Sequence, residues 1–351
     1  MQPLSAYSSG RDNNFNLIRV IAATLVLYSH CFPLALGEGS TDPLGALIGR
    51  SLGQIAVDIF FITSGFLVTQ SLVHRPSIGS FMWARIIRIF PALIVAMLFC
   101  VFVVGLYFTT LPSSEYLAHQ EVHTFLKKNL TLIWGDRYAL PGVFEQNIYP
   151  GAVNGSIWTL PWELKMYILL ALVALIFRGY KHWLIIAIAL IGTLGYLIDH
   201  LALFGGLETN PSKPRFLAFF FVGSLFYLYR NHIHLSHRLM AAISTVLLFS
   251  VILQLNTLFF IAYTLTLAYV VLYLAYIPTG AIRKFNHLGD YSYGIYIYAF
   301  PVQQASVALL PGIGIYEMLA IATPLTLLLA IISWHLIEKP ALRLKNKTPA
   351  R

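Results

Sequence analysis

Charged side chains are scarce in this chain. They make up 11% of its 351 residues, whereas soluble domains have roughly 25%. Hydrophobic residues reach 58%, and the mean hydropathy is +0.73. This composition excludes an ordinary soluble domain. It predicts an all-α integral membrane protein that crosses the lipid bilayer several times.

Cysteine is almost absent. The two cysteines, Cys31 and Cys100, both lie in apolar stretches and cannot form a disulfide framework. Three histidines cluster at 232–237, but no cysteine or carboxylate joins them at ligand spacing, which favours a solvated loop over a zinc site. Neither a P-loop nor a GxSxG elbow occurs. We therefore expect no bound metal and no tightly bound cofactor.

Acidic residues are also few, since 14 Asp and Glu stand against 23 Lys and Arg, a formal net charge of +9. The basic residues are scattered singly between apolar segments and do not cluster on one helix or arm. This distribution argues against a nucleic-acid partner and is typical of topology signals in membrane proteins.

The apolar segments predict the membrane spans, each of which needs roughly 20 residues. The first contains Arg19 and is longer than the roughly 7–15-residue core of a signal peptide, so we expect it to stay in the protein. About ten transmembrane helices are expected, at about 15–36, 52–73, 81–107, 162–178, 183–204, 215–229, 239–254, 257–277, 291–311 and 315–337.

The charges also predict the orientation of this bundle. With the N-terminus inside, most Lys and Arg fall at cytoplasmic ends, as is usual for membrane proteins. We expect a cytoplasmic segment at 1–14, a transmembrane domain at 15–338 and a basic cytoplasmic tail at 339–351, so that both termini are cytoplasmic. A polar loop at about 111–160 is expected outside. No internal repeat is visible, which argues against the inverted repeats common in transporters.

Two ionisable residues mark the first span. Arg19 and His30 are eleven positions apart, so their side chains share a helix face to within about 20° but lie about 16 Å apart along the axis. His30 is well inside the membrane, where an ionisable group costs about 2.5–3.5 kcal/mol and is a functional-site candidate. A hydrogen-bonded structural histidine is the alternative interpretation.

Two carboxylates lie in or beside spans. Asp58 is inside the second span, and Glu163 is at the outer start of the fourth. Either could orient an imidazole or hold a proton. The alternatives are a structural tie between Asp58 and Arg19 or another basic side chain, and for Glu163 a helix-start role, where a carboxylate favours the N-terminal dipole.

The segment RIIRIFPAL places Arg85 and Arg88 three residues apart and therefore on one helix face. Two guanidiniums could clamp phosphates, because their planar forks bind phosphate oxygens in pairs. Arginines at a cytoplasmic helix end also anchor helices, and that interpretation stays open.

Seven segments occur in the order seen in the acyltransferase 3 family of membrane-bound O-acyltransferases, which the chain resembles over about residues 13–345. They are FNLIRVIAATLVLYSH, VDIFFITSGFL, RIIRIFPAL, SIWTLPWELKMYIL, RFLAFFFVGSLFYLY, LGDYSYGIYIYAFPVQQ and WHLIEKPALRL. The resemblance implies about ten membrane helices and transfer of an acyl group, commonly acetyl, from cytoplasmic acyl-CoA to a carbohydrate hydroxyl. It also implies a multi-pass protein of the bacterial inner membrane.

By position, the resemblance gives roles to the first and third spans. His30 matches the histidine generally held to be catalytic in the family, and Arg19 matches its first-helix arginine. Arg85 and Arg88 match the RxxR pair that is associated with the acyl donor.

The resemblance also includes Ser64, in the SGF segment, and Glu163, in the WxLxxE signature. Two features depart from the family. Some relatives have a histidine at the position of Ala299, so that histidine cannot be required here. No hydrolase-like domain follows Arg351, so we expect the chain to act alone or with a partner.

These observations predict a membrane O-acyltransferase in which His30 is the general base on the acceptor hydroxyl, oriented by Asp58 or Glu163. An acyl-histidine relay stays open, and so does a homo-oligomeric state. A rival from another class is a transporter or flippase for a sugar or acyl species. The predicted catalytic residues are His30, Asp58 and Glu163. The predicted donor-binding residues are Arg19, Ser64, Arg85 and Arg88.

Overall fold

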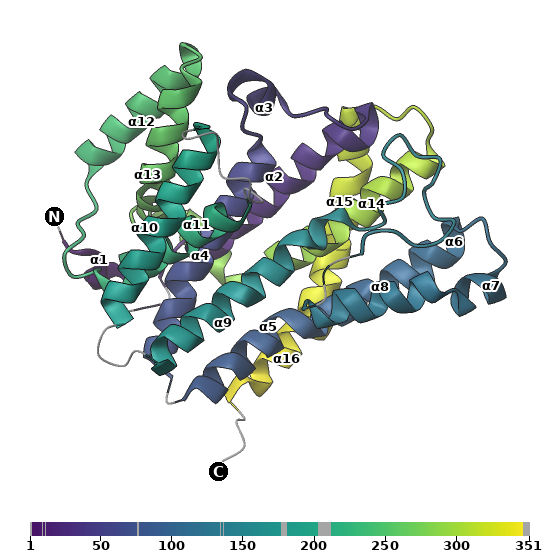
Figure 1. The fold of residues 1–351 in the computed structure, drawn as a ribbon, viewed down its shortest axis with the longest axis horizontal. Helices are drawn as coiled ribbons and strands as arrows, with labels where there is room; N and C mark the ends of the chain where they lie inside the picture. Colours follow the sequence, from purple (N-terminus) through teal and green to yellow (C-terminus); the bar gives the residue numbers. More distant parts are fainter. Residues whose placement is uncertain are drawn as a thin grey trace. The chain divides into compact units, whose positions relative to one another are not determined.

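The computed structural model describes residues 2–8, 10, 12–75, 77–133, 135, 137–176, 181–202 and 212–346. Within these ranges all regular elements are helical (Figure 1). Each of the ten predicted spans contains a helix, although the predicted ends at 178 and 204 and the tail from 347 lie outside the described residues. The helices are α2 (Phe15–Leu36), α4 (Leu52–Val73), α5 (Ile78–Phe99), α9 (Leu160–Ile176), α10 (Lys181–His200), α11 (Ser212–Leu228), α12 (His237–Ile252), α13 (Asn256–Tyr276), α14 (Ser292–Leu309) and α15 (Ile315–Ser333).

In the described part of the chain, seven helical segments are long and apolar enough to cross a membrane. They include α5 extended through the π-helix η1 (Cys100–Gly105) and α6 (Leu106–Phe108), and α15 extended through the π-helix η5 (Trp334–Glu338) and α16 (Lys339–Arg343). α11 and α12 are apolar but shorter, and α14 is not among the seven. A multi-pass membrane protein is therefore supported, while the count of ten and the cytoplasmic termini stay predictions.

The chain divides into two compact units. The first unit comprises Met1–Ala22, Pro43–Phe81 and Met166–Gly289. The second unit comprises Ala23–Asp42, Met82–Lys165 and Asp290–Arg351.

In the first unit, α4 begins with a capping box. Ser51 Oγ accepts from the Gln54 amide, and Gln54 Oε1 accepts from the Ser51 amide, each at 3.1 Å. The two bonds satisfy amides that have no partner within the helix. This explains why the span begins at Leu52, where the hydrophobic pattern places it.

The crossing of α4 and α11 is very close (Figure 1). A Cβ atom at Gly65 would lie 1.9 Å from the carbonyl oxygen of Phe220, and one at Gly223 would lie 2.3 Å from that of Ile62. Small residues allow such approach of helix backbones in membrane proteins. Gly65, the glycine of the SGF segment, therefore allows α4 to pack closely against α11.

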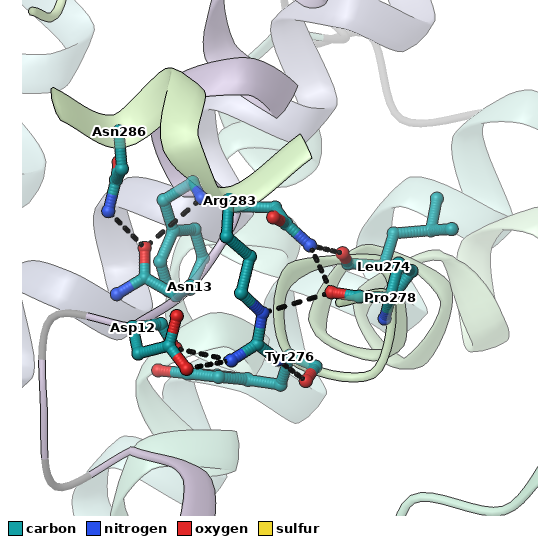
Figure 2. Close-up of polar contacts among 9 residues, drawn as sticks. Asp12, Asn13, Leu274, Tyr276, Pro278, Arg283 and Asn286 are labelled. Carbon is teal, nitrogen blue, oxygen red and sulfur yellow. Dashed lines mark hydrogen bonds and ion pairs between the residues drawn. The ribbon is translucent and has the colours of Figure 1, made fainter. Parts of the chain in front are cut away.

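The N-terminal segment, predicted as a cytoplasmic extension, folds into the first unit. Its short helix α1 (Leu4–Tyr7) buries Leu4, whose amide donates to the Ile233 carbonyl at 2.7 Å. Figure 2 shows the polar contacts at the end of this segment, where Arg283 pairs with Asp12 and donates to the Tyr276 carbonyl at 2.5 Å. Arg283, from the 3₁₀-helix η4 (Gly280–His287), thus caps the end of α13.

In the second unit, α14 is the core helix. All but three of its 18 residues are buried, and Gln303 and Gln304 have no exposed surface. Its tyrosines, serines and glutamines make it more polar than the other spans. These groups are tolerated because neighbouring protein surrounds the helix and supplies hydrogen-bond partners.

The predicted outer loop at about 111–160 is folded where it is described. It contains α7 (Ser113–Ala118), α8 (Gln120–Thr131) and the 3₁₀-helix η2 (Gly155–Thr159). Gln304 Nε2 donates to the carbonyls of Tyr149 and Ala152 at 2.8 and 2.7 Å, and Asn147 donates to Gln304 Oε1 at 2.8 Å. One buried glutamine therefore holds this segment on α14.

Candidate active site

His30 lies on the part of α2 that belongs to the second unit. Its ring is half-buried and meets Phe300 of α14 edge-on, with ring centroids 5.3 Å apart and planes at 81°. Nδ1 of His30 is enclosed and has no hydrogen-bond partner among the described residues. Buried polar atoms are normally paired. His30 therefore differs from a structural histidine whose ring nitrogens are satisfied.

Gln303 fixes the helix turn that carries His30. Its Nε2 donates to the Leu27 carbonyl at 2.8 Å and lies 3.0 Å from Cys31 Sγ. Because the Leu27 carbonyl only accepts, this contact identifies the amide nitrogen and leaves Oε1 as the acceptor. That Oε1 is buried, and the described part of the chain gives it no hydrogen-bond partner either. Two unsatisfied polar atoms thus belong to the same crossing of α2 and α14.

The rest of this crossing is apolar. Ala299 packs in one cluster with Leu27, Cys31 and Phe300. The absence of a histidine at position 299 is therefore accommodated by apolar packing. On its other side Phe300 meets Tyr149 of the loop, with ring centroids 6.2 Å apart.

Arg88 joins three of the sequence segments that carry the family resemblance. Its Nη2 lies 2.5 Å from Asp290 Oδ2, and its Nη1 lies 3.4 Å from Glu338 Oε2. Its guanidinium also lies 5.9 Å from the centroid of the Tyr293 ring. The RxxR, GDYSY and WHLIEKP segments therefore meet around one arginine.

Local structure holds both carboxylates in place. Ser292 Oγ donates to Asp290 Oδ1 at 2.5 Å at the start of α14. Glu338 ends the π-helix η5, is buried, and accepts from Ser333 Oγ at 3.1 Å. π-helical turns are uncommon and often lie at functional sites. Here the turn brings Glu338 to Arg88.

Arg85 and Glu163 also belong to the second unit, and both are half-buried. Arg85 is one turn before Arg88 on α5, as the sequence predicts. Glu163 lies in the first turn of α9, and both Glu163 and Glu338 are within electrostatic range of the Tyr293 hydroxyl. The donor-binding role of Arg85 and the catalytic role of Glu163 stay predictions.

Asp58 forms an ion pair and a hydrogen bond within the first unit. Arg215 Nε donates to its Oδ1 at 2.6 Å, and the Tyr263 hydroxyl donates to its Oδ2 at 2.5 Å. A structural ion pair was the alternative interpretation of Asp58 in the sequence, and Arg215 is the basic partner. Both oxygens of the carboxylate are occupied, and orientation of His30 by Asp58 stays a prediction.

Ser64 and Arg19 also belong to the first unit. Ser64 Oγ lies 2.8 Å from the Tyr167 hydroxyl. The Arg19 guanidinium lies 5.9 Å from the centroid of the Phe60 ring. Their predicted roles toward the acyl donor stay predictions.

Sequence reasoning missed Gln303, Gln304, Asp290 and Glu338 as members of these clusters. A signal for two of them was present, because adjacent glutamines are rare in an apolar span and need partners there. Asp290 and Glu338 looked like ordinary loop carboxylates. In the described residues, no group of three His, Cys, Asp or Glu side chains could hold a metal ion.

Apolar helices and enclosed polar clusters define a multi-pass membrane protein with chemically competent side chains between its helices. The chain belongs to the acyltransferase 3 family, whose acyltransferase domain matches residues 12–337. It is 30% identical over 348 residues to an O-acetyl transferase of Shigella phage Sf6, covering 94% of this chain and 96% of that protein. It is 29% identical over 380 residues to nodulation protein 10 of Rhizobium leguminosarum bv. viciae, covering 100% of this chain and 99% of that protein.

These findings confirm the resemblance seen in the sequence. The protein is an O-acyltransferase. No solved structure matches the chain.

Proposed function

We propose that the protein moves an acetyl group from cytoplasmic acyl-CoA to a hydroxyl of a cell-surface or lipid-linked carbohydrate. The name of the phage relative supports acetyl as the acyl group. The carbohydrate acceptor and the bacterial inner membrane rest on the family resemblance. The observation that carries the proposal in the structure is His30, a half-buried imidazole in an apolar helix whose Nδ1 has no partner in the parts of the chain that the structure describes.

In this reaction His30 takes the proton from the acceptor hydroxyl as the hydroxyl oxygen attacks the thioester carbonyl. The carbon–sulfur bond then breaks, and the CoA thiolate recovers the proton from the imidazolium. Histidine suits both steps because it gains and loses a proton near neutral pH. The nearly perpendicular contact with Phe300 limits the directions in which the imidazole ring can turn, which favours one orientation for proton transfer.

An imidazole that uses Nε2 as a base carries its other proton on Nδ1, and that proton needs an acceptor. Glu163 and Asp58 are the acceptors expected from the sequence. The structure adds Gln303, whose Oε1 is an unpaired acceptor at the same helix crossing. We assign Gln303 to positioning His30.

The donor is expected to enter at the RxxR pair. Arg88 is held by Asp290 and Glu338, so we assign it to fixing the local structure. We assign phosphate contacts to Arg85 because it lies one turn before Arg88 on the same face of α5. Arginine binds phosphate oxygens through its planar fork. The charged end of acyl-CoA then stays at the membrane surface while its uncharged pantetheine arm enters between helices.

Release of free CoA tests the proposal. Purified protein is incubated with acetyl-CoA, and free thiol is measured with and without an extract of bacterial surface glycans. The wild-type protein and a His123→Ala control, in which an exposed histidine of α8 is changed, should release CoA in an acceptor-dependent way. His30→Ala should not. Normal release by His30→Ala would overturn the general-base role.

The acyl-histidine relay differs from direct transfer in one measurable way. A relay predicts label on the protein when radioactive acetyl-CoA is supplied without acceptor. Direct transfer predicts no labelled protein under those conditions.

A further inference from the structure

Arg50 is a buried arginine outside the residues assigned above. It lies in the first unit, between α3 (Pro43–Ile48) and the N-cap of α4, and is only 7% exposed. Its guanidinium lies 5.5 Å from the centroid of the Tyr196 ring and 5.4 Å from that of Phe260. The two rings themselves are 5.0 Å apart. Two aromatic side chains, from α10 and α13, thus enclose one cation.

The charges around Arg50 are not balanced within the described residues. Asp58 is within electrostatic range of both Arg50 and Arg215. It forms its ion pair with Arg215, at 2.6 Å, and its second oxygen accepts from Tyr263. Arg50 has no ion pair in the described parts of the chain. Among the described residues the cluster therefore holds two enclosed guanidiniums against one carboxylate, and a buried charge without a counter-charge is costly.

The hydroxyl beside Arg50 has no acceptor for its own proton. The Tyr196 hydroxyl is buried and interacts with Arg50, which can only donate to it, and the described residues offer its proton no acceptor. On α13, Oγ1 of Thr264 is buried without a partner in the described residues. Thr264 is four residues after Phe260 on α13, so the two side chains share a helix face. The N-terminus of α4, which follows Arg50 directly, adds a positive partial charge. The Arg50 guanidinium and the Tyr196 hydroxyl therefore lie at the same rings, and Thr264 adds a hydroxyl donor on the face of α13 that carries Phe260.

We propose that Arg50, Tyr196 and Thr264 bind a phosphate group. A tetrahedral oxyanion compensates the excess positive charge and accepts hydrogen bonds from all three donors, which a neutral ligand does not. The aromatic rings of Tyr196 and Phe260 form the apolar wall of the site. The phosphate group is carried by a phospholipid headgroup or is free inorganic phosphate. This proposal is independent of the proposed acyl transfer.

Thermal unfolding of the full chain in detergent tests the proposal in two arms. One arm titrates inorganic phosphate against sodium chloride of equal ionic strength. The other titrates dihexanoyl phosphatidylglycerol against dihexanoyl glycerol, which lacks the phosphate. A rise in Tm with inorganic phosphate identifies the free anion. A rise with the phospholipid alone identifies the headgroup. No rise in either arm would overturn the proposal.

Variants then locate the site. Arg50→Gln should weaken the apparent phosphate affinity at least about tenfold, the effect of losing one charge-assisted hydrogen bond. Arg137→Gln, which makes the same charge change at an arginine paired with Glu121, should leave the affinity unchanged.

If Arg50→Gln does not fold, Tyr196→Phe provides a second test of the phosphate site. It removes only a hydroxyl whose proton has no acceptor among the described residues, so the ligand-free Tm should change little, whereas the phosphate-induced shift should shrink. Wild-type shifts in both Arg50→Gln and Tyr196→Phe would overturn the assignment.

Discussion

Arg88 and Asp290 are 202 residues apart in sequence, yet the guanidinium of the first lies 2.5 Å from the carboxylate of the second. Glu338 contacts the same guanidinium from a third segment. An arginine of the RxxR pair is therefore part of the scaffold of the second unit.

Arg88→Ala should destabilise the protein, whereas Arg85→Ala should weaken donor binding. Removing Arg88 leaves the buried Glu338 and Asp290 without that partner, and loss of one member of a buried ion pair costs about 3–5 kcal/mol. Thermal unfolding in detergent measures this loss. Arg85→Ala should raise the KM for acyl-CoA about 10- to 150-fold, with partial rescue by Arg85→Lys. A wild-type Tm for Arg88→Ala would remove Arg88 from the scaffold.

Asp58→Asn and Glu163→Gln should separate a structural from a catalytic carboxylate. Asp58→Asn removes the counter-charge of the buried Arg215, so a loss of about 3–5 kcal/mol is expected. Glu163 is half-buried, and Glu163→Gln should fold normally and lower kcat. Both unfolding temperature and kcat are measured for each variant. Normal kcat in a well-folded Glu163→Gln protein would exclude Glu163 as the group that orients His30.

Gln303→Met should lower kcat about 10- to 100-fold, the usual range for losing a residue that orients a catalytic histidine. The KM for acyl-CoA should stay unchanged. The matched variant Gln304→Met removes the neighbouring glutamine, which holds the loop, so it should lower Tm more than Gln303→Met does. Equal effects of both variants on Tm and kcat would show that Gln303 contributes only packing.

Gly65→Ala should prevent normal folding. Its new Cβ atom would lie 1.9 Å from a backbone oxygen of α11, which cannot move aside as a flexible side chain does. Gly79→Ala is the control, because the nearest atom to its Cβ is 3.9 Å away. The amount of monodisperse protein extracted from membranes measures both. Normal yield of Gly65→Ala would mean that α4 and α11 are farther apart than described.

Cysteine labelling should establish the topology. Gln120→Cys lies on the predicted outer loop and His287→Cys at a predicted cytoplasmic end, and both positions are exposed. The native Cys31 and Cys100 are fully buried, so a membrane-impermeant thiol reagent should not reach them in the folded protein. In intact cells, position 120 should be labelled and position 287 should not. The reverse pattern would place the donor site on the outer face.

The first two spans were predictable to the residue. The expected ranges 15–36 and 52–73 match α2 and α4, because polar residues flank both apolar runs and Ser51 with Gln54 forms a capping box. The match to the acyltransferase 3 family was predictable from ordered motifs. The apolar runs, the capping box and each motif are contained in short stretches of sequence.

Long-range partners were not predictable. Arg215 and Asp58 are 157 residues apart, and nothing in the periodicity of either helix identifies the other. The N-terminal residues looked like a polar extension, yet Leu4 is buried against a segment more than 200 positions away. Such contacts depend on which helices become neighbours, which an amphipathic pattern does not specify.

The burial of α14 has a consequence for how the protein is made. This helix carries Gln303, Gln304, Ser292 and Ser306 into the core, and these side chains find hydrogen-bond partners there in other segments or along α14 itself. During synthesis it emerges before α15, and the free energy of inserting its polar side chains into lipid alone is unfavourable. Stable insertion of α14 therefore depends on docking against neighbouring helices, and α15, which packs against it, follows it in the chain.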